Sequence, residues 1–377
     1  MDVGIEKIGL SLPRLFVDSR DLSVLRGWNP NKIVLGLGIK SLGVPEQYED
    51  SVSLAANAAR HALDQGIKRE EIGRLVVATE TGVDSAKPIS AYLHQLLGLD
   101  SDTEIYEVKH ACVGGVYALC DSLDWIRAGQ NQGRKALVVC TDIARYARGS
   151  PAEPTQSAGA VALLVSDKPS LIRFEGQTGT YSENVSDFWR PLNQAEAVVN
   201  GKYSLECYTK AVLEAYYDLK RKRKIEFDKF VFHTPFPRLV KKVMSRILLE
   251  EGKTGELEEE VQERVGASLN ASSQLGNIYT GSIFLALASL LDLGLEDEKQ
   301  LALLSYGSGC SSKALIGVRG NQGLGFSLES MLSNRMRISA EDYDSLIYGD
   351  LDNRIQNPSG FFLSGVSNGY RSYGEIK

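Results

Sequence analysis

The sequence predicts an α/β protein made of two similar halves, each a largely parallel sheet with helices on both faces. Short apolar runs typical of buried strands alternate with segments whose apolar residues recur at helical spacing. This alternation occurs twice along the 377 residues, on either side of a stretch rich in polar and small side chains at residues 177–203. We therefore expect an internal structural duplication, although the residues of the two halves do not repeat.

The first predicted half covers residues 1–176. It opens with the alternating stretch IEKIGLSLP (5–13), which is typical of a strand. Three segments with helical spacing follow, and each ends at a glycine, a common helix stop. Helices are predicted at 51–66, 89–98 and 115–129. Further strands are predicted at 74–80, 105–110, 135–142, 159–167 and 170–176.

The second predicted half covers residues 177–377 and repeats this scheme loosely. Helices are predicted at 204–224, 238–252 and 276–294, and the last of them is entered through a loop. Strands are predicted at 228–236, 301–309, 312–320 and 360–366. The tail after about residue 321 has weak periodicity, and only the last of these strands is predicted in it.

Charge and composition exclude several classes of function. A formal net charge of −6 gives no positive field that would recruit nucleic acid or an anionic membrane. The N-terminus has no basic stretch followed by an apolar one, so no signal peptide is predicted. No apolar run approaches the roughly 20 residues that span a bilayer. A cytoplasmic protein is therefore expected.

The cysteines indicate neither a disulfide framework nor a zinc site. They are odd in number, irregularly spaced and never arranged as C-x-x-C, which favours a reducing compartment. The five are Cys112, Cys120, Cys140, Cys207 and Cys310. No metal site is predicted, and no glycine-rich loop of a nucleotide-binding type follows a strand.

Polar side chains follow three predicted strands at their C-terminal ends, the edge of an open α/β sheet where ligands bind. They are Glu80, Cys112 and His233. A carboxylate at the mouth of a buried strand is partly desolvated, which raises its pKa toward neutrality and suits acid–base chemistry. Asn277 just before a helix and Ser308 in a glycine-flanked turn are two further candidates.

Cys112 stands in YEVKHACVGGVYAL, between a predicted strand and a glycine pair that opens into a helix. Unpaired N–H groups and the helix dipole would lower the pKa of its thiol, and the same groups could hold an oxyanion. Gly114 and Gly115 would let the backbone turn tightly and admit a ligand closely. The spacing also fits a buried structural cysteine, and both interpretations stay open at this point.

The histidines are equally ambiguous. His233 comes before a Thr-Pro turn, where it can project into a cleft or remain a half-buried hydrogen-bonded residue. His61 and His94 fall inside amphipathic helices and are expected to be structural. His110 precedes Cys112 by two residues on a predicted strand, and its role stays open.

Eight segments resemble the signature segments of hydroxymethylglutaryl-CoA synthases, a family of the thiolase superfamily. They run in the family's order from about residue 3 to about residue 320. The segments are ATETGVDSAK, KHACVGG, TDIARYA, EPTQSAGAVALLV, SDFWRP, FHTPF, GNIYTGS and SYGSG. The resemblance implies a thiolase-like fold, in which duplicated βαβαβαββ halves form a layered αβαβα core with the active site between them, usually in a homodimer.

The resemblance also implies a role for each candidate. Cys112 would take acetyl from acetyl-CoA as a thioester, and Glu80 would act as general base on the acetyl methyl group. His233 would hold and protonate the carbonyl of the acceptor, helped by Asn277. The backbone N–H groups of Cys112 and Ser308 would form the oxyanion hole. These are the acyl holder, base and electrophile stabiliser that a Claisen-type condensation needs.

Other positions match residues that contact acyl-CoA in the family. They are Asn29, Tyr146, Ser204 and Lys242, and Lys241 is a neighbour that would share the CoA phosphates as a point charge. The implied reaction joins acetyl-CoA, acetoacetyl-CoA and water to give 3-hydroxy-3-methylglutaryl-CoA and free CoA, within mevalonate and isoprenoid synthesis. The CoA thioesters are substrates, and neither a metal nor another cofactor is implied.

Three alternatives remain at the level of sequence. The first is a polyketide-branching synthase of the same family, which would condense onto a β-ketoacyl group carried by an acyl carrier protein. The second is a ketoacyl carrier-protein synthase, against which Glu80 argues, because decarboxylative condensation needs no such base. The third is a non-catalytic subunit that binds acyl-CoA or a carrier protein.

Overall fold

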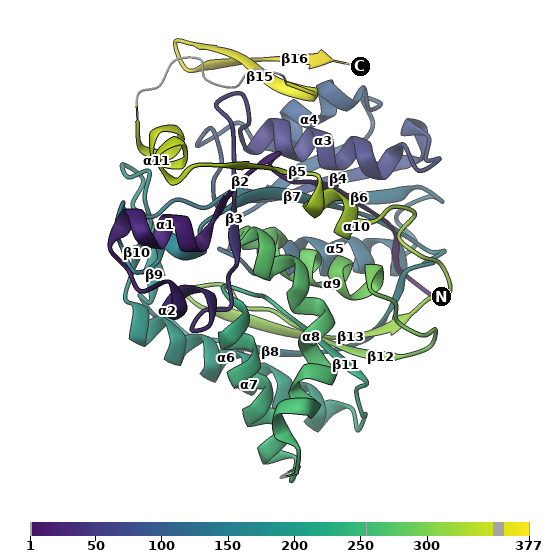
Figure 1. Cartoon of the computed structure of the whole chain (residues 1–377). Coiled ribbons are helices and arrows are strands. Elements are labelled where there is room, and N and C mark those ends of the chain that lie inside the picture. Colours follow the sequence, from purple (N-terminus) through teal and green to yellow (C-terminus); the bar gives the residue numbers. More distant parts are fainter. Residues whose placement is uncertain (1, 254, 350–357, 377) are drawn as a thin grey trace.

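The computed structural model describes residues 2–253, 255–349 and 358–376, and these form a layered α/β structure around one large sheet (Figure 1). The sheet has nine strands. In spatial order they are β11 (Lys229–Phe232), β12 (Gln300–Leu304), β13 (Ser311–Arg319), β8 (Ile172–Ser182), β1 (Gly4–Ser11), β7 (Ala158–Ser166), β6 (Lys135–Ile143), β4 (Ile72–Ala78) and β5 (Glu104–Val108).

A narrow junction divides this sheet into two parts. β1 and β8 pair only at Gly4 with Arg173 and at Ile5 with Ile172. The part on one side of the junction contains β1, β4, β5, β6 and β7. If these are numbered 1 to 5 in chain order, their spatial order is 3-2-4-5-1 (β5-β4-β6-β7-β1). On the other side, β11-β12-β13-β8 repeats the order 2-4-5-1, and no strand of the described residues is a counterpart of the third. The predicted duplication is therefore confirmed.

The prediction of a largely parallel sheet is wrong. Within the nine-stranded sheet, only the pairs β4–β5, β4–β6 and β11–β12 run parallel. The pairs β1–β7, β1–β8, β6–β7, β12–β13 and β13–β8 are antiparallel. The reason lies in the connections: β6 leads to β7, and β12 to β13, without the intervening helix that a parallel crossover uses.

Six helices form where helical spacing predicted them. They are α3 (Ser51–Leu63), α4 (Ile89–Leu97), α5 (Gly114–Arg127), α6 (Gly201–Lys222), α7 (Pro237–Glu250) and α9 (Ser282–Asp292). Local signals fix some of their ends: Asp50 and Ser53 form a capping box at the start of α3, and Gly98 ends α4 with a φ of 63°. In Figure 1, α3 and α4 cover one outer face, α6 and α7 the other, and α5 and α9 lie between the two parts of the sheet.

The sequence prediction missed several elements. The largest is α8 (Leu257–Leu275), whose buried Val261, Val265 and Leu269 do recur at helical spacing. Between β1 and α3 lie β2 (Leu15–Asp18), α1 (Ser19–Arg26), α2 (Pro30–Val34) and β3 (Ser41–Val44), and after β8 lie β9 (Phe188–Trp189) and β10 (Val198–Val199). The tail adds α10 (Leu328–Ser333), β14 (Met336–Ile338), α11 (Ala340–Tyr348) and the hairpin β15 (Gly360–Ser367) to β16 (Tyr370–Ile376), so only its predicted strand at 360–366 is confirmed.

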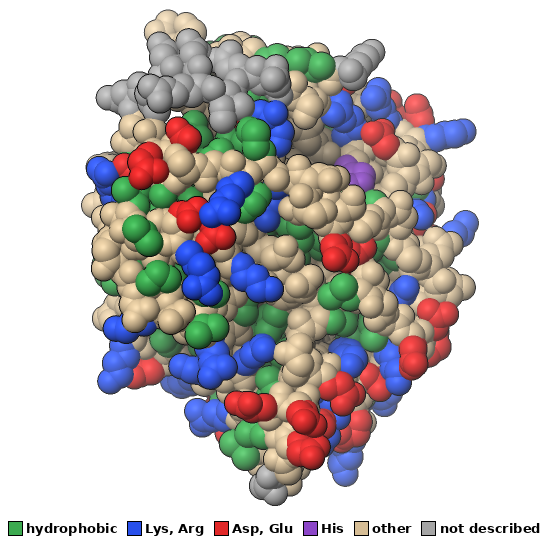
Figure 2. Space-filling view, in the orientation of Figure 1, with side chains coloured by type: hydrophobic (Ala, Val, Ile, Leu, Met, Phe, Trp, Pro, Cys, Tyr) green, Lys and Arg blue, Asp and Glu red, His purple; other side chains and the backbone are tan. Residues whose placement is uncertain are grey.

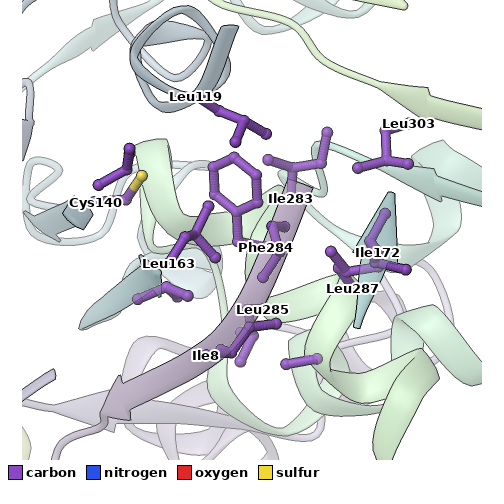
Figure 3. Close-up of a cluster of buried hydrophobic side chains, with 14 of the residues drawn as sticks. Ile8, Leu119, Cys140, Leu163, Ile172, Ile283, Phe284, Leu285, Leu287 and Leu303 are labelled. Carbon is purple, nitrogen blue, oxygen red and sulfur yellow. The ribbon is translucent and has the colours of Figure 1, made fainter. Parts of the chain in front are cut away.

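The core is densest around α9, whose side chains from Ser282 to Leu291 are all buried. Phe284 lies in one cluster with Leu119 of α5 and Cys140 of β6, and the same cluster includes Leu303 of β12 (Figure 3). Because α9 packs against both parts of the sheet, the segment that enters it is held between them. Among the described residues, every helix is too short or too polar to span a bilayer.

Candidate active site

Cys112 lies in the turn that joins β5 to α5, just before the helix begins at Gly114. The residue is buried, with 8% of its surface exposed. Its predecessor Ala111 has a φ of 41°, in the left-handed region that non-glycine residues rarely occupy. Backbone strain of this kind clusters at functional sites, where surrounding structure holds it. The turn therefore presents Cys112 as a fixed group at a helix N-terminus.

Glu80 follows β4 and makes a direct contact with the cysteine. The Cys112 thiol donates to Glu80 Oε1 over 3.0 Å. Burial, reinforced by the nearby charge of Asp142, raises the pKa of Glu80 to about 8. A carboxyl group with a pKa near neutrality can both accept and return a proton, which is the property that acid–base catalysis requires.

The pKa of the Cys112 thiol moves in the direction opposite to the sequence prediction. Burial and the adjacent Glu80 carboxylate raise it well above its ordinary value, whereas the helix N-terminus was expected to lower it. The resting group is therefore a thiol. Its attack on a substrate requires a base at Sγ, and Glu80 lies within hydrogen-bond distance to serve as one.

Asp142, at the end of β6, fixes the position of Glu80 and was not predicted. Its fully buried carboxylate accepts from the Glu80 N–H at 2.9 Å, from the Thr81 N–H at 3.1 Å and from the Thr280 N–H at 3.0 Å. The hydroxyls of Thr79, Thr81 and Thr280 donate to it as well. Asp142 therefore ties the strand end that carries Glu80 to the segment entering α9. The only signal in the sequence was a carboxylate after the apolar run LVVCT.

His233 follows β11 and is buried, with 2% of its surface exposed. Its backbone N–H donates to Leu304 O at 2.9 Å, and its carbonyl accepts from the Tyr208 hydroxyl at 2.7 Å. Burial lowers the pKa of the imidazole to about 3, so the ring is neutral at physiological pH. Its Nδ1 has no hydrogen-bond partner among the described residues. A neutral imidazole with a free ring nitrogen can donate to, or accept from, a bound carbonyl substrate.

Asn277 precedes α9, and its side-chain oxygen accepts two hydrogen bonds from within the protein. Oδ1 accepts from the Tyr279 N–H at 2.9 Å and from the Ser282 hydroxyl at 2.7 Å. This orientation leaves the amide NH₂ group as the donor available to a ligand.

Ser308 is held by a second carboxylate that sequence analysis missed, Asp187. This fully buried residue accepts from the Ser308 hydroxyl at 3.0 Å, from the Tyr306 hydroxyl at 2.6 Å and from the Gly309 N–H at 3.2 Å. The hydroxyl of Ser204 donates to Asp187 Oδ2 at 3.2 Å, the oxygen that also accepts from Ser308 and Tyr306. Asp187 therefore fixes the turn that carries Ser308 against the start of α6.

The turn of Ser308 touches the turn of Cys112 through Gly307. A Cβ atom at Gly307 would lie 2.6 Å from Val113 Cγ1 and 2.7 Å from His110 O. Glycine is thus required for the two turns to approach, and the approach brings the predicted oxyanion-hole residues together. His110 itself stacks on Tyr117 with ring centroids 5.6 Å apart.

We expect Gly307→Ala to lower turnover about tenfold or more, because the added methyl group must push the Ser308 turn away from Cys112. Steady-state kinetics with acetyl-CoA would measure the loss. Gly176→Ala is the matched control, since a Cβ there meets no atom within 4 Å. Equal turnover in the two variants would contradict the expectation.

The glycines after Cys112 serve a different purpose from the one predicted. A Cβ at Gly115 would lie 2.5 Å from Cys140 Sγ and 2.9 Å from Thr280 O, whereas a Cβ at Gly114 would meet only ordinary contacts. Gly115 therefore lets α5 pack closely on β6 and on the segment before α9, and it does not make space for a ligand.

A cavity of about 350 Å³ opens between the two halves beside these groups. Six predicted site residues line it: Cys112, Tyr146, Ser204, His233, Asn277 and Ser308. Near the cysteine its wall is aromatic, with Tyr146, Phe188 and Tyr279 packed edge to face at centroid distances of 5.8 to 6.4 Å. An apolar wall with few convergent polar groups is typical of a small-molecule site.

The remaining predicted residues lie outside this cavity. Lys242 on α7 lines a second cavity of about 730 Å³, which shares Leu205, Phe236 and Leu239 with the first. Lys241 points elsewhere and donates to Gln262 at 2.9 Å. Asn29 caps α2 by accepting from the Asn31 N–H at 3.0 Å. Neither Lys241 nor Asn29 belongs to the lining of these two cavities.

Comparison with known proteins agrees with this geometry. Family models described as the N-terminal and C-terminal parts of hydroxymethylglutaryl-coenzyme A synthase match residues 1–170 and residues 172–260 and 249–356. The chain belongs to the hydroxymethylglutaryl-CoA synthase family. Its fold is thereby thiolase-like, as the sequence predicted. The predicted catalytic and binding roles of individual residues stay predictions.

The relatives include both CoA-dependent and polyketide enzymes. The hydroxymethylglutaryl-CoA synthase of Enterococcus faecalis is 31% identical, with 99% of this chain and 100% of the relative covered. A polyketide-biosynthesis 3-hydroxy-3-methylglutaryl-ACP synthase of Bacillus subtilis is also 31% identical, over 93% of this chain and 89% of the relative. A structure of MvaS in complex with 3-hydroxy-3-methylglutaryl coenzyme A superposes with a TM-score of 0.94 at 35% identity, covering 100% and 99% of the two chains.

Proposed function

We propose that this protein condenses acetyl-CoA with acetoacetyl-CoA and water to give 3-hydroxy-3-methylglutaryl-CoA and CoA, in the mevalonate route to isoprenoids. The observation that carries the proposal is the Cys112 thiol 3.0 Å from Glu80, beside a cavity that His233 and Asn277 also line. It is supported by two relatives named hydroxymethylglutaryl-CoA synthase, which match over 99% and 83% of this chain.

The first step is the transfer of the acetyl group. Cys112 Sγ attacks the thioester carbon of acetyl-CoA while its proton passes to Glu80, and the bond to the CoA sulfur breaks. The backbone N–H groups of Cys112 and Ser308 stabilise the oxyanion of the tetrahedral intermediate. The CoA thiolate takes the proton from Glu80 and leaves as free CoA, which returns Glu80 to its ionised form.

The second step forms the carbon–carbon bond, and water completes the reaction. Glu80 removes a proton from the acetyl methyl group, and the resulting enolate carbon attacks the ketone carbon of acetoacetyl-CoA. His233 and the Asn277 amide donate hydrogen bonds to the ketone oxygen. The alkoxide that forms takes its proton from the His233 imidazole, which regains one from the protonated Glu80. Water then hydrolyses the thioester to Cys112 and releases a carboxylate. No step calls for a metal or a redox cofactor.

The cations beside the second cavity suit the phosphates of CoA. Lys202, Lys210, Lys242 and Arg246 line it, together with Glu206, Glu214 and Glu250 and with apolar side chains that continue into the catalytic cavity. Arg246 is already paired with Glu250 over 2.9 Å, which leaves Lys242 as the nearest candidate for a phosphate. Figure 2 shows Lys and Arg side chains over the part of the surface that α6 and α7 form in Figure 1. An elongated acyl-CoA could therefore place its phosphates at Lys242 and its thioester near Cys112.

A carrier-bound acceptor is the second candidate, because a polyketide relative matches over 93% of this chain and a structure of the curacin-pathway HMG synthase with a donor ACP matches over 100% of it. The test compares turnover of acetoacetyl-CoA with that of acetoacetyl attached to an acyl carrier protein, with acetyl-CoA as the donor. We expect the CoA acceptor to be preferred at equal concentration. Preference for the carrier-bound acceptor would overturn the CoA assignment and leave the chemistry unchanged.

We expect His233→Ala to slow condensation by roughly 10²-fold to 10³-fold and leave acetylation of Cys112 nearly intact, because the imidazole acts on the acceptor carbonyl. Single-turnover mass spectrometry separates the two steps. His94→Ala is the control, since this ring is bonded to Asp100 O on the surface side of α4. Loss of acetylation in His233→Ala would show that His233 acts in the acetylation step, and it would contradict the role proposed here in condensation.

The proposal includes a cytoplasmic homodimer. All five cysteines are free thiols, as a reducing compartment favours. β5 is an edge strand of the large sheet, and an unpaired edge is a template for a second copy of the chain. Light scattering should give twice the mass of one chain, and the mass of a single chain would contradict the dimer.

A further inference from the structure

Tyr146, part of the aromatic wall near Cys112, makes both of its backbone hydrogen bonds with side chains. Its N–H donates to Gln156 Oε1 at 2.9 Å, and its carbonyl accepts from the Tyr348 hydroxyl at 2.9 Å. Tyr348 is the last residue of α11, 202 residues further along the chain. The position of this wall is therefore set from the C-terminal part of the protein.

The orientation of Gln156 follows from its neighbours. Its Nε2 donates to the Tyr343 hydroxyl at 2.7 Å and to the Tyr348 hydroxyl at 3.2 Å. Tyr343 donates in turn to Glu153 Oε1 at 3.1 Å. Because an ionised carboxylate only accepts, the Tyr343 proton points at Glu153 and its lone pair faces Gln156. The amide NH₂ group must then face the two tyrosines, which leaves the amide oxygen for Tyr146.

This chain of bonds ends in a buried ion pair. Glu153 is fully buried, and Arg26 of α1 donates to it from Nε at 3.0 Å and from Nη2 at 2.7 Å. Arg26 also pairs with Asp344 on α11, which has a second partner in Arg148. Figure 1 places α11 beside α1. The two helices and the loop that carries Tyr146 thus form one connected polar network.

We propose that α11 positions Tyr146 over the acyl group on Cys112, through Tyr343, Tyr348 and Gln156, and thereby limits the size of the acyl group that the pocket accepts. This inference rests on the proposed acylation of Cys112. The three residues are positioning residues, because none of them lines the catalytic cavity. A wall held by two hydrogen bonds moves when one is removed, and small displacements near a reacting group have large effects on rate.

The test measures the rates at which Cys112 takes acetyl from acetyl-CoA and propionyl from propionyl-CoA, by mass spectrometry of the intact protein. Tyr348→Phe keeps the ring and removes the hydroxyl that holds Tyr146. We expect the maximum acetylation rate to fall about fivefold, the usual effect of one lost hydrogen bond. The concentration of acetyl-CoA at half-maximal rate should stay unchanged, because Lys242 and its neighbours are untouched. The ratio of the propionylation rate to the acetylation rate should rise.

Tyr216→Phe is the control, since it removes a hydroxyl that is hydrogen-bonded to Glu251 from a tyrosine outside the catalytic cavity that is more deeply buried than Tyr348. It should keep the acetylation rate and the propionyl-to-acetyl ratio of the wild type. If Tyr348→Phe matches the wild type in both quantities, the inference is wrong. It is equally wrong if both rates fall in proportion and the ratio stays constant, because that is the result of general destabilisation.

Alkylation of Cys112 by iodoacetamide tests the same inference without the proposed function. Peptide mapping separates this thiol from the other four. A loosened wall should make alkylation of Cys112 several-fold faster in Tyr348→Phe than in the wild type and in Tyr216→Phe. A wild type that takes no acetyl group would contradict the proposed function, and the alkylation rates would then decide the role of α11: equal rates would overturn it.

Discussion

Cys112→Ala is expected to abolish the acetyl adduct and to lower condensation by a factor on the order of 10⁵, because no other group can carry the acetyl group beside Glu80. The measurement is the mass of the intact protein after incubation with acetyl-CoA, together with the release of free CoA. The fold should persist, since the side chain is small and alanine fits the same turn. Its thermal unfolding midpoint should stay close to that of the wild type.

The control for this experiment is Cys120→Ala. Cys120 lies on α5, two turns beyond Cys112, and it does not line the catalytic cavity. Its variant should acetylate at the wild-type rate. An undiminished adduct in Cys112→Ala, mapped to any other residue, would refute the assignment of the nucleophile.

The alternation of strands and helices was predictable because each element has its own local signal. Apolar runs marked β4 and β6, and helical spacing with a terminal glycine marked α3 and α5. The direction of the strands was not predictable in this way. The one sign of an antiparallel pair was the lack of a helical segment between the predicted strands at 135–142 and 159–167, the strands that became β6 and β7.

The three central site residues were predictable because they share a position, the C-terminal end of a strand. That rule placed Glu80, Cys112 and His233 at one edge, and the last of them lines the cavity that also contains Cys112. It did not identify Asp142 or Asp187, because the structural role of these residues depends on hydrogen bonds with partners that are distant in sequence. Each of these carboxylates joins segments more than a hundred residues apart.

The pKa values of Cys112 and Glu80 also depend on features that are not visible in the local sequence. A helix N-terminus is visible in the sequence and favours a thiolate, whereas the depth of burial around Cys112 is set by the folded chain as a whole. Burial raises the pKa of both the thiol and the Glu80 carboxyl. The consequence is a thiol hydrogen-bonded to Glu80 over 3.0 Å, in place of a preformed thiolate.

Glu80→Gln is expected to slow condensation by about 10³-fold, because the amide cannot remove a proton from the acetyl methyl group. Acetylation of Cys112 should slow as well, since Glu80 is the hydrogen-bonded acceptor of the thiol proton, but some adduct should still form. Single-turnover experiments that are quenched at short times, with the acetyl-Cys112 adduct and the condensation product quantified separately, would distinguish the two effects. Glu107→Gln is the control, because this carboxylate bonds the Ile89 N–H at the start of α4.

The pH dependence gives an independent measure of the same group. With a pKa of about 8, Glu80 is mostly protonated at neutral pH, and only the ionised form can accept a proton. The rate of condensation should therefore fall about tenfold for each pH unit below 8 and level off above it. Glu80→Gln should remove this slope, because the amide does not titrate. A wild-type profile that stays flat from pH 6 to pH 8 would exclude Glu80 as the base, whatever the variant does.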